Sequence, residues 1–148
     1  MARLSSLGAE LLLETLERYD SIVPKVQDHA FASLAPILKK DDGHIDFSRT
    51  AADINYRVRG FQPFPASFTQ FRGKRLTIWK CSVATGFEPA ASVSEAEIVA
   101  AKADELIVAC GADTFLSVEE LQLEGKKRSG VRDFINGGKP AVGEHFGE

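Results

Sequence analysis

The sequence has 148 residues, enough for one domain or for a small domain with an appended helical segment, and it can bury a core without metal or disulfide support. Hydrophobic residues make up 44% and charged residues 26%, which excludes a disordered tail. No apolar run approaches the roughly 20 residues that span a bilayer, and the first residues lack the apolar core of a signal peptide. We therefore expect a globular, cytoplasmic protein with no membrane partner.

The charges are segregated along the chain. The net charge of −3 by itself argues against a nucleic-acid partner. However, residues 54–80 carry six bases and no acid, whereas residues 81–125 carry one base and nine acids. These blocks could fold into a basic face backed by an acidic face, or they could form two ordinary solvated faces. The charge pattern is therefore compatible with a nucleic-acid partner without requiring one.

The first third of the sequence predicts helices. Apolar residues recur at helical spacing from Leu4 onward, so we expect a helix over 4–23 that Pro24 stops. The next apolar stretch, 30–38, is expected to be short or irregular because Pro36 interrupts it. Residues 41–43 then mark a turn.

A further helix is expected after this turn, with apolar residues on one face between positions 51 and 61. Asp46 or Ser48 can cap its start. Asp53 and Arg57 lie four residues apart and are expected to pair. This pairing would leave Arg59, on the other flank, as the freer charge.

Beyond residue 65, short β-rich runs replace the helical spacing. We predict strands over 67–71, 76–83, 98–101, 106–110 and 114–123, and a short helix around 131–135. Arg72, Gly73 and Lys74 form a hairpin-like reversal with basic residues at its tip. Five short antiparallel strands with tight turns favour a small barrel or roll, so the fold class is α+β with helices before the strands.

Catalytic machinery is not evident in the sequence. It contains no P-loop, no nucleophile elbow and no HExxH motif. His29, His44 and His145 lie in three different segments, and we expect surface or capping roles for them. Cys81 and Cys110 have no Cys or His neighbour, so we expect buried free thiols and no metal site. The oxygen-rich run 41–46 misses the spacing of a calcium loop.

Cations and aromatic residues that could bind a nucleic acid are plentiful. The cations lie around the predicted hairpin, on the helix before it and in a glycine-bounded loop near 126: Arg57, Arg59, Arg72, Lys74, Arg75, Lys80, Lys126, Lys127 and Arg128. Basic hairpin tips can neutralise phosphates, and exposed aromatic rings can stack on bases. Phe68 and Trp79 lie within predicted strands, where aromatic side chains usually belong to the core.

Six short motifs follow one another along the chain: DGHIDF at 42–47, AADINYRVRG at 51–60, FQPFPASFT at 61–69, GKRLTIW at 73–79, VACG at 108–111 and LQLEGKKR at 121–128. In this order they resemble the C-terminal domain of methionyl-tRNA formyltransferases. The family pattern there contains IDW, A-x-x-I-x-N-x-I-R-G, P-W-P-G-A-x-T, G-K-x-L-K-I-W, V-x-C-G and L-Q-x-x-G-K-K-R. GAELLLETL at 8–16 also resembles the segment that joins this domain to the catalytic half.

The sequence departs from this pattern at several positions. Phe47 and Phe64 replace Trp, Ala66 and Ser67 replace a Gly-Ala step, and Ser129 stands where Met is usual. These replacements keep the role of a packed or turn residue. A Pro-Gly pair that precedes the later strands in the family is missing around 94–98, so that loop is expected to differ.

The resemblance implies a helical linker over 1–40 and a small, open, antiparallel β-barrel over 41–148 that is OB-like and binds tRNA. The implied partners are initiator methionyl-tRNA and a Rossmann-like catalytic half that binds 10-formyltetrahydrofolate. The chain itself would hold no catalytic residue, cofactor or metal, and would be inactive alone. Residues expected to contact the tRNA are Arg59, Arg72, Lys74, Arg75, Lys126, Lys127 and Arg128.

Two alternatives stay open at this point. The same module could belong to a formyltransferase acting on a nucleotide sugar, or to a formyltetrahydrofolate hydrolase or dehydrogenase. It could also be a stand-alone binding module. The GKKR loop and the basic stretch 54–80 favour the tRNA enzyme.

Overall fold

The computed structural model describes residues 2–89 and 92–147 and divides the chain into two compact units, residues 1–36 and residues 37–148. In the first unit, α1 (Ala2–Glu17) forms where the apolar spacing predicts a helix, but it ends before the expected end at residue 23, and a 3-10 turn over Tyr19–Ser21 follows it. Its leucines are more than half exposed, among them Leu4, Leu7 and Leu11. Residues 30–38 are irregular as expected, with one 3-10 turn at His29–Phe31.

The second unit begins with a 3-10 turn at Lys40–Gly43, and α2 (Ala51–Gly60) follows it. The expected cap at Asp46 or Ser48 was wrong, because Thr50 is the N-cap and its hydroxyl accepts the amide of Asp53 at 3.2 Å. Asp46 instead accepts hydrogen bonds from the hydroxyl and from the amide of Ser48, and these bonds lower the pKa of its carboxyl.

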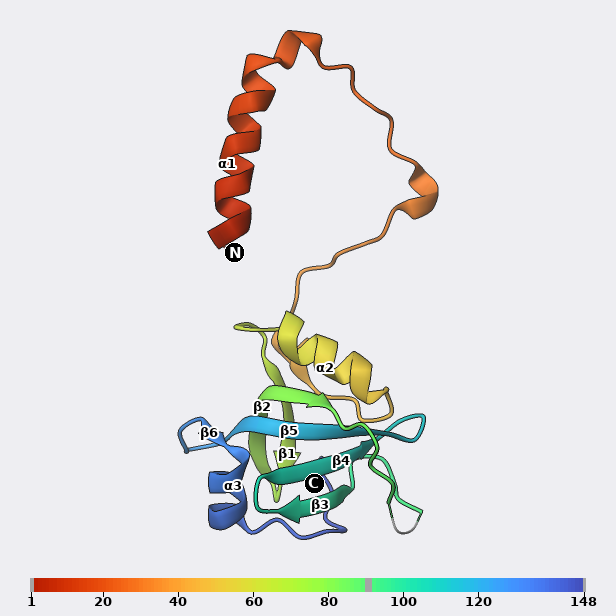
Figure 1. Ribbon diagram of the computed structural model, residues 1–148, viewed down its shortest axis with the longest axis vertical. Helices are drawn as coiled ribbons and strands as arrows, with labels where there is room; N and C mark the ends of the chain where they lie inside the picture. Colours follow the sequence, from red (N-terminus) through yellow and green to blue (C-terminus); the bar gives the residue numbers. More distant parts are fainter. Residues whose placement is uncertain (1, 90–91, 148) are drawn as a thin grey trace. The chain divides into compact units, whose positions relative to one another are not determined.

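Five strands form one antiparallel sheet in the order β1-β2-β5-β4-β3 (Figure 1). They are β1 (Ser67–Phe71), β2 (Lys74–Val83), β3 (Ile98–Lys102), β4 (Glu105–Cys110) and β5 (Thr114–Leu123). The two-residue β6 (Ser129–Gly130), which the sequence did not predict, pairs with β5 and leads into α3 (Val131–Gly138). Helix α2 packs on β2 and β5, and α3 lies beside β4, β5 and β6.

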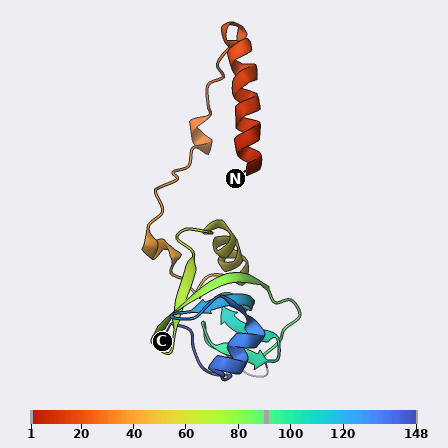
Figure 2. The ribbon, with the colours of Figure 1, turned by 90° about the vertical axis from the view of Figure 1, so that its left-hand side faces the viewer.

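The sheet itself is not closed, but other backbone segments cover its two outer strands. The amide of Ile45 donates to Phe68 in β1 at 2.8 Å. The segment 143–147 bonds to Ile98 in β3, and the amide of Gly147 donates to Gln70 in β1 at 2.9 Å. Figure 2 shows the C-terminal segment beside β1. Both outer strands therefore have fewer free backbone groups than open edges would have.

The main core lies between the inner face of the sheet, α2 and α3. Alternation along the strands directs Leu76, Ile78 and Leu116 inward, and each is fully buried. Cys81 and Cys110 belong to this core as free thiols, which confirms the expectation for them. Their burial raises the pKa of each thiol to about 12.

A smaller cluster covers the outer face of β4. Ile107, Ala109 and Phe115 pack there against partly buried residues of the connection between β2 and β3, including Phe87 and Val93. The rings of Phe87 and Phe115 are 5.1 Å apart.

Within residues 2–89 and 92–147, no helix has the length and apolar character that crossing a membrane requires.

Two glycines are required by close backbone contact. A Cβ atom on Gly111 would lie 1.8 Å from the carbonyl oxygen of Ser48, and one on Gly43 would lie 2.2 Å from that of Ala66. The amide of Gly111 also donates to the carbonyls of Phe47 and Arg49. The Gly111 contact fastens the loop before α2 to the end of β4.

Candidate nucleic-acid interface

The β1–β2 hairpin and the β5–β6 turn bring the predicted cations together at neighbouring strand ends. Arg72 and Gly73 both have positive φ, 50° and 70°, as a two-residue hairpin turn of the primed type requires. The backbone of Arg75 forms two hydrogen bonds with Glu124. The carbonyl of Arg75 accepts from the amide of Glu124 at 2.8 Å, and the amide of Arg75 donates to the carboxylate of Glu124 at 3.2 Å. Lys74 and Arg75 therefore lie next to the turn that carries Lys126.

Four of the predicted cations at this edge and on α2 lack an acidic partner. Within residues 2–89 and 92–147, no ion pair involves Arg59, Lys74, Lys126 or Lys127, and all four side chains are exposed. The guanidinium of Arg59 lies 5.4 Å from the ring of Tyr56. These charges remain available to phosphate groups.

Arg75 also has no ion pair in the described part of the chain, but its guanidinium lies 3.7 Å from the ring centroid of Phe68. A stacked guanidinium keeps its in-plane N–H donors free. Arg75 can therefore contact a phosphate or a base edge without leaving the ring.

Three other candidate cations are already bound to acids. Lys80 is one of them, and its ammonium lies 2.6 Å from a carboxylate oxygen of Glu119. Arg72 forms a two-bond contact with the carboxylate of Glu144, at 2.9 Å for each bond, and donates to the carbonyls of Gly138 and Lys139. Arg128 pairs with Glu120 and lies 5.2 Å from the ring of Trp79. Glu120 of β5 is therefore the acidic partner of the GKKR loop.

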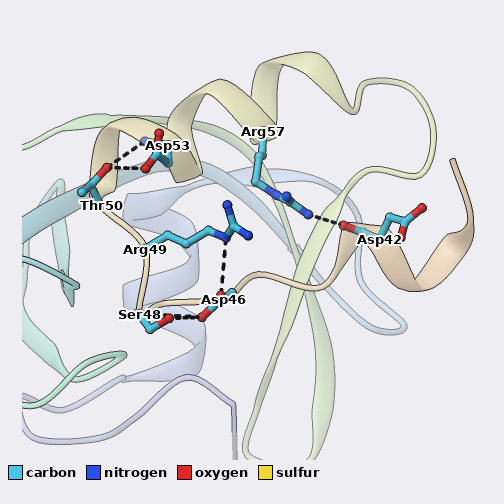
Figure 3. A network of polar contacts seen from close by, with 7 residues as sticks. All are labelled: Asp42, Asp46, Ser48, Arg49, Thr50, Asp53 and Arg57. Carbon is cyan, nitrogen blue, oxygen red and sulfur yellow. Dashed lines mark hydrogen bonds and ion pairs between the residues drawn. The ribbon is translucent and has the colours of Figure 1, made fainter. Parts of the chain in front are cut away.

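Arg57 and Asp53 do not pair, contrary to the sequence-based expectation (Figure 3). Arg57 donates to the backbone carbonyl of Asp42 at 2.8 Å, and Asp53 is bound to the hydroxyl of Thr50 at 2.9 Å. Arg57 also lies over the ring of Phe61, 4.8 Å from its centroid. Its role here is to hold the loop before α2 against that helix.

The expectation that Phe68 and Trp79 belong to the core was wrong. Both are half-buried and face outward from β1 and β2, each beside an arginine. The indole N–H of Trp79 donates to Gln122 at 3.2 Å, which fixes the ring on the outer face of the sheet. Alternation could have indicated this, because Thr69 and Phe71 occupy the buried face of β1.

The histidines do not form a catalytic arrangement. His145 Nε2 lies 2.6 Å from the hydroxyl of Ser94, but the carboxylate of Glu97 approaches the same ring nitrogen, at 4.0 Å, and also accepts from Ser94. A triad requires the acid on the other nitrogen. The ring of His44 instead meets Phe68 edge-on. In the part of the chain that the structure describes, no cluster of metal-binding side chains occurs.

The formyl transferase C-terminal domain family matches residues 37–139. The chain therefore belongs to this family. HypX from Aquifex aeolicus, also solved in complex with tetrahydrofolic acid, shares the fold with TM-scores of 0.57 and 0.56 at 14% identity. The match covers 91% of this chain and 24% of HypX in the first structure.

Several curated relatives of this chain are methionyl-tRNA formyltransferases. The chain is 49% identical over 148 residues to the methionyl-tRNA formyltransferase of Koribacter versatilis. The aligned region covers 98% of this chain and 45% of that protein. It is 44% identical to that of Acidobacterium capsulatum over 90% of this chain, and 43% identical to that of Solibacter usitatus over 99%. It spans less than half the length of these relatives.

Proposed function

We propose that this chain is the C-terminal domain of a methionyl-tRNA formyltransferase and helps to position initiator methionyl-tRNA for N-formylation in the cytoplasm. The observation that carries the proposal is a group of cations at the β1–β2 and β5–β6 turns that form no ion pair with any acid the structure describes: Lys74, Arg75, Lys126 and Lys127. The relatives named above favour this reading over a nucleotide-sugar enzyme or a stand-alone module.

The catalytic half and its co-substrate, 10-formyltetrahydrofolate, are part of this proposal. The chain spans less than half of its relatives, so we assign formyl transfer to the remainder of the full protein. The exposed leucines of α1, including Leu4, Leu7 and Leu11, support a packing role for this helix against that remainder.

An OB-like barrel is the arrangement that we propose for the sheet. Its support is the segment 143–147, which bonds to both outer strands and spans the opening between them. Such barrels commonly bind single-stranded nucleic acids and oligonucleotides on one face.

The proposal is tested by measuring tRNA binding at several salt concentrations. The chain should bind tRNA weakly, with a dissociation constant near 10⁻⁴ to 10⁻⁶ M at physiological salt, as a small electrostatic interface does. Replacing Lys126 and Lys127 by Ala should lower the salt slope by about two units. Adding Arg128→Ala should lower it by less than one further unit, because Arg128 is already paired with Glu120.

A matched control removes the same charge elsewhere in the chain. Lys25 and Lys102 are exposed and lie outside the proposed interface. Replacing both by Ala should leave the salt slope nearly unchanged. Equal effects of the two double variants, or tRNA binding that does not respond to salt, would contradict a phosphate-binding role for the β5–β6 turn.

A separate assay addresses catalysis. The chain incubated with 10-formyltetrahydrofolate and charged initiator tRNA should give no formyl-methionyl product, because the proposed catalytic half is not part of it. Formyl transfer that persists through repurification would refute this division of roles.

A further inference from the structure

A cavity of about 380 Å³ opens between the β5–β6 turn and α3. Leu121 and Leu123 of β5 and Phe134 of α3 line its apolar part, and the last turn of α3 borders it with Gly137 and Gly138. Its volume falls in the range of roughly 300–1,000 Å³ that small-molecule sites occupy. The two glycines carry no side chain that could fill it.

The floor of this cavity is held in place by packing and hydrogen bonds. Leu121 is 1% exposed, and the ring of Phe134 meets that of Phe71 at 5.5 Å. Arg72 donates to the carbonyls of Gly138 at 2.9 Å and Lys139 at 3.1 Å, so the end of α3 is tied to the β1–β2 hairpin. The site is therefore formed before any ligand arrives.

The charged residues at the cavity are Lys126, Lys127 and Asp133. Neither lysine takes part in an ion pair among the described residues. Two unpaired ammonium groups beside an apolar cavity suit a ligand that has an anionic end and an apolar body. The carboxylate of Asp133 can accept only, so it suits a ligand whose body also carries N–H donors.

We propose that this cavity binds one unstacked nucleotide of a bound RNA. The base enters the apolar part, with an N–H group toward Asp133, and the adjoining phosphates meet Lys126 and Lys127. Proteins read RNA mainly at loops and bulges, where a base can leave the stack. The inference rests on the proposed function, because it requires RNA to lie along this edge of the sheet.

The test compares a short RNA duplex with the same duplex carrying one unpaired nucleotide in the middle of a strand. We expect the chain to bind the bulged duplex about tenfold more tightly, since accommodating one base stabilises a complex to that extent. The backbone amides of Ser129, Gly137 and Gly138 should shift in NMR spectra with the bulged duplex and not with the plain one.

Gly137→Leu narrows the cavity without changing any charge. A Cβ atom at this position meets nothing within 4 Å, and Leu is a better helix former than Gly, so the fold should be kept. This variant should bind both duplexes alike. Gly8→Leu is the control, because Gly8 also lies in a helix with open space around it and should keep the preference.

Each outcome bears on the inference. Equal binding of the two duplexes by the unaltered chain would overturn it, as would a preference that survives in Gly137→Leu. Shifts of the same amides on raising the protein concentration without RNA would also overturn it, because a second copy would then fill the cavity. If the unaltered chain binds neither duplex nor tRNA, the proposed function fails as well.

Discussion

Replacing Gly111 by Ala should disrupt the contact between β4 and the loop before α2. The added Cβ atom would lie 1.8 Å from the carbonyl oxygen of Ser48 and 2.5 Å from its carbonyl carbon. Both atoms belong to the backbone, so no side-chain rotation can relieve the overlap. The loop must move away, and the bonds from the Gly111 amide to Phe47 at 2.8 Å and to Arg49 at 3.0 Å are then lengthened or lost.

The magnitude follows from these two consequences. Overpacking of this kind costs about 1–3 kcal/mol, and each weakened hydrogen bond costs about 0.5–1.5 kcal/mol. Phe47, which is 7% exposed, would also lose part of its burial. We therefore expect Gly111→Ala to lower the free energy of unfolding by about 3 kcal/mol and the melting temperature by about 10 °C.

Thermal unfolding followed by circular dichroism measures this change. Gly60→Ala is the matched control, because a Cβ atom at the end of α2 meets nothing within 4 Å, and Ala is the better helix former. It should melt at the same temperature or slightly higher. If Gly111→Ala melts within about 2 °C of the unaltered chain, the loop yields freely and the argument from backbone contact is refuted.

Three further changes test other parts of the domain. Ala66 has a φ of 61°, a left-handed conformation that Gly adopts readily and Val does not. In urea unfolding, Ala66→Gly should therefore be neutral or slightly stabilising, whereas Ala66→Val should lower the free energy of unfolding by more than about 1 kcal/mol. Equal stability of the two variants would contradict this. The amide of Ala141 and the guanidinium of Arg72 lower the pKa of Glu144, so its contribution to stability is present above the ordinary value of 4.5 and is lost as pH falls through the lowered pKa. Glu144→Gln should therefore show a weaker loss of stability on acidification, and an unchanged acid limb would refute that. Because burial raises the pKa of Cys81 and Cys110 to about 12, neither thiol should react with iodoacetamide at pH 8 until the chain unfolds, and rapid labelling of the folded chain would contradict their burial.

The elements of this fold could be predicted because their signals are local. The alternation that defines β1 and β5 is contained in each strand, and the structure places Ser67–Phe71 and Thr114–Leu123 where the sequence predicts them. The helix stripe of α1 is equally local, although the α-helix ends at Glu17, before the residue that was expected to stop it. In these cases the information lies within ten residues or so, which is the range of secondary-structure periodicity.

Contacts between distant residues could not be predicted in the same way. Arg57 has Asp53 one helical turn away, yet it donates to the carbonyl of Asp42, which only the folded loop brings near. Arg72 binds Glu144, 72 positions away. The sequence offers many acids to each arginine, and local spacing does not choose among them. For this reason the candidate site was predicted as a set of cations, while the structure divides that set into paired and unpaired members.

The bonding of residues 143–147 to β1 and β3 has a consequence for synthesis on the ribosome. Translation proceeds from the N-terminus, so strands β1 to β5 leave the exit tunnel before this segment does. Until then the backbone groups of Gln70 and Ile98 that it later occupies stay open to strands of neighbouring nascent chains. Between the emergence of β5 and the emergence of Gly147, these backbone groups of the two outer strands therefore lack the partners that they have in the folded domain.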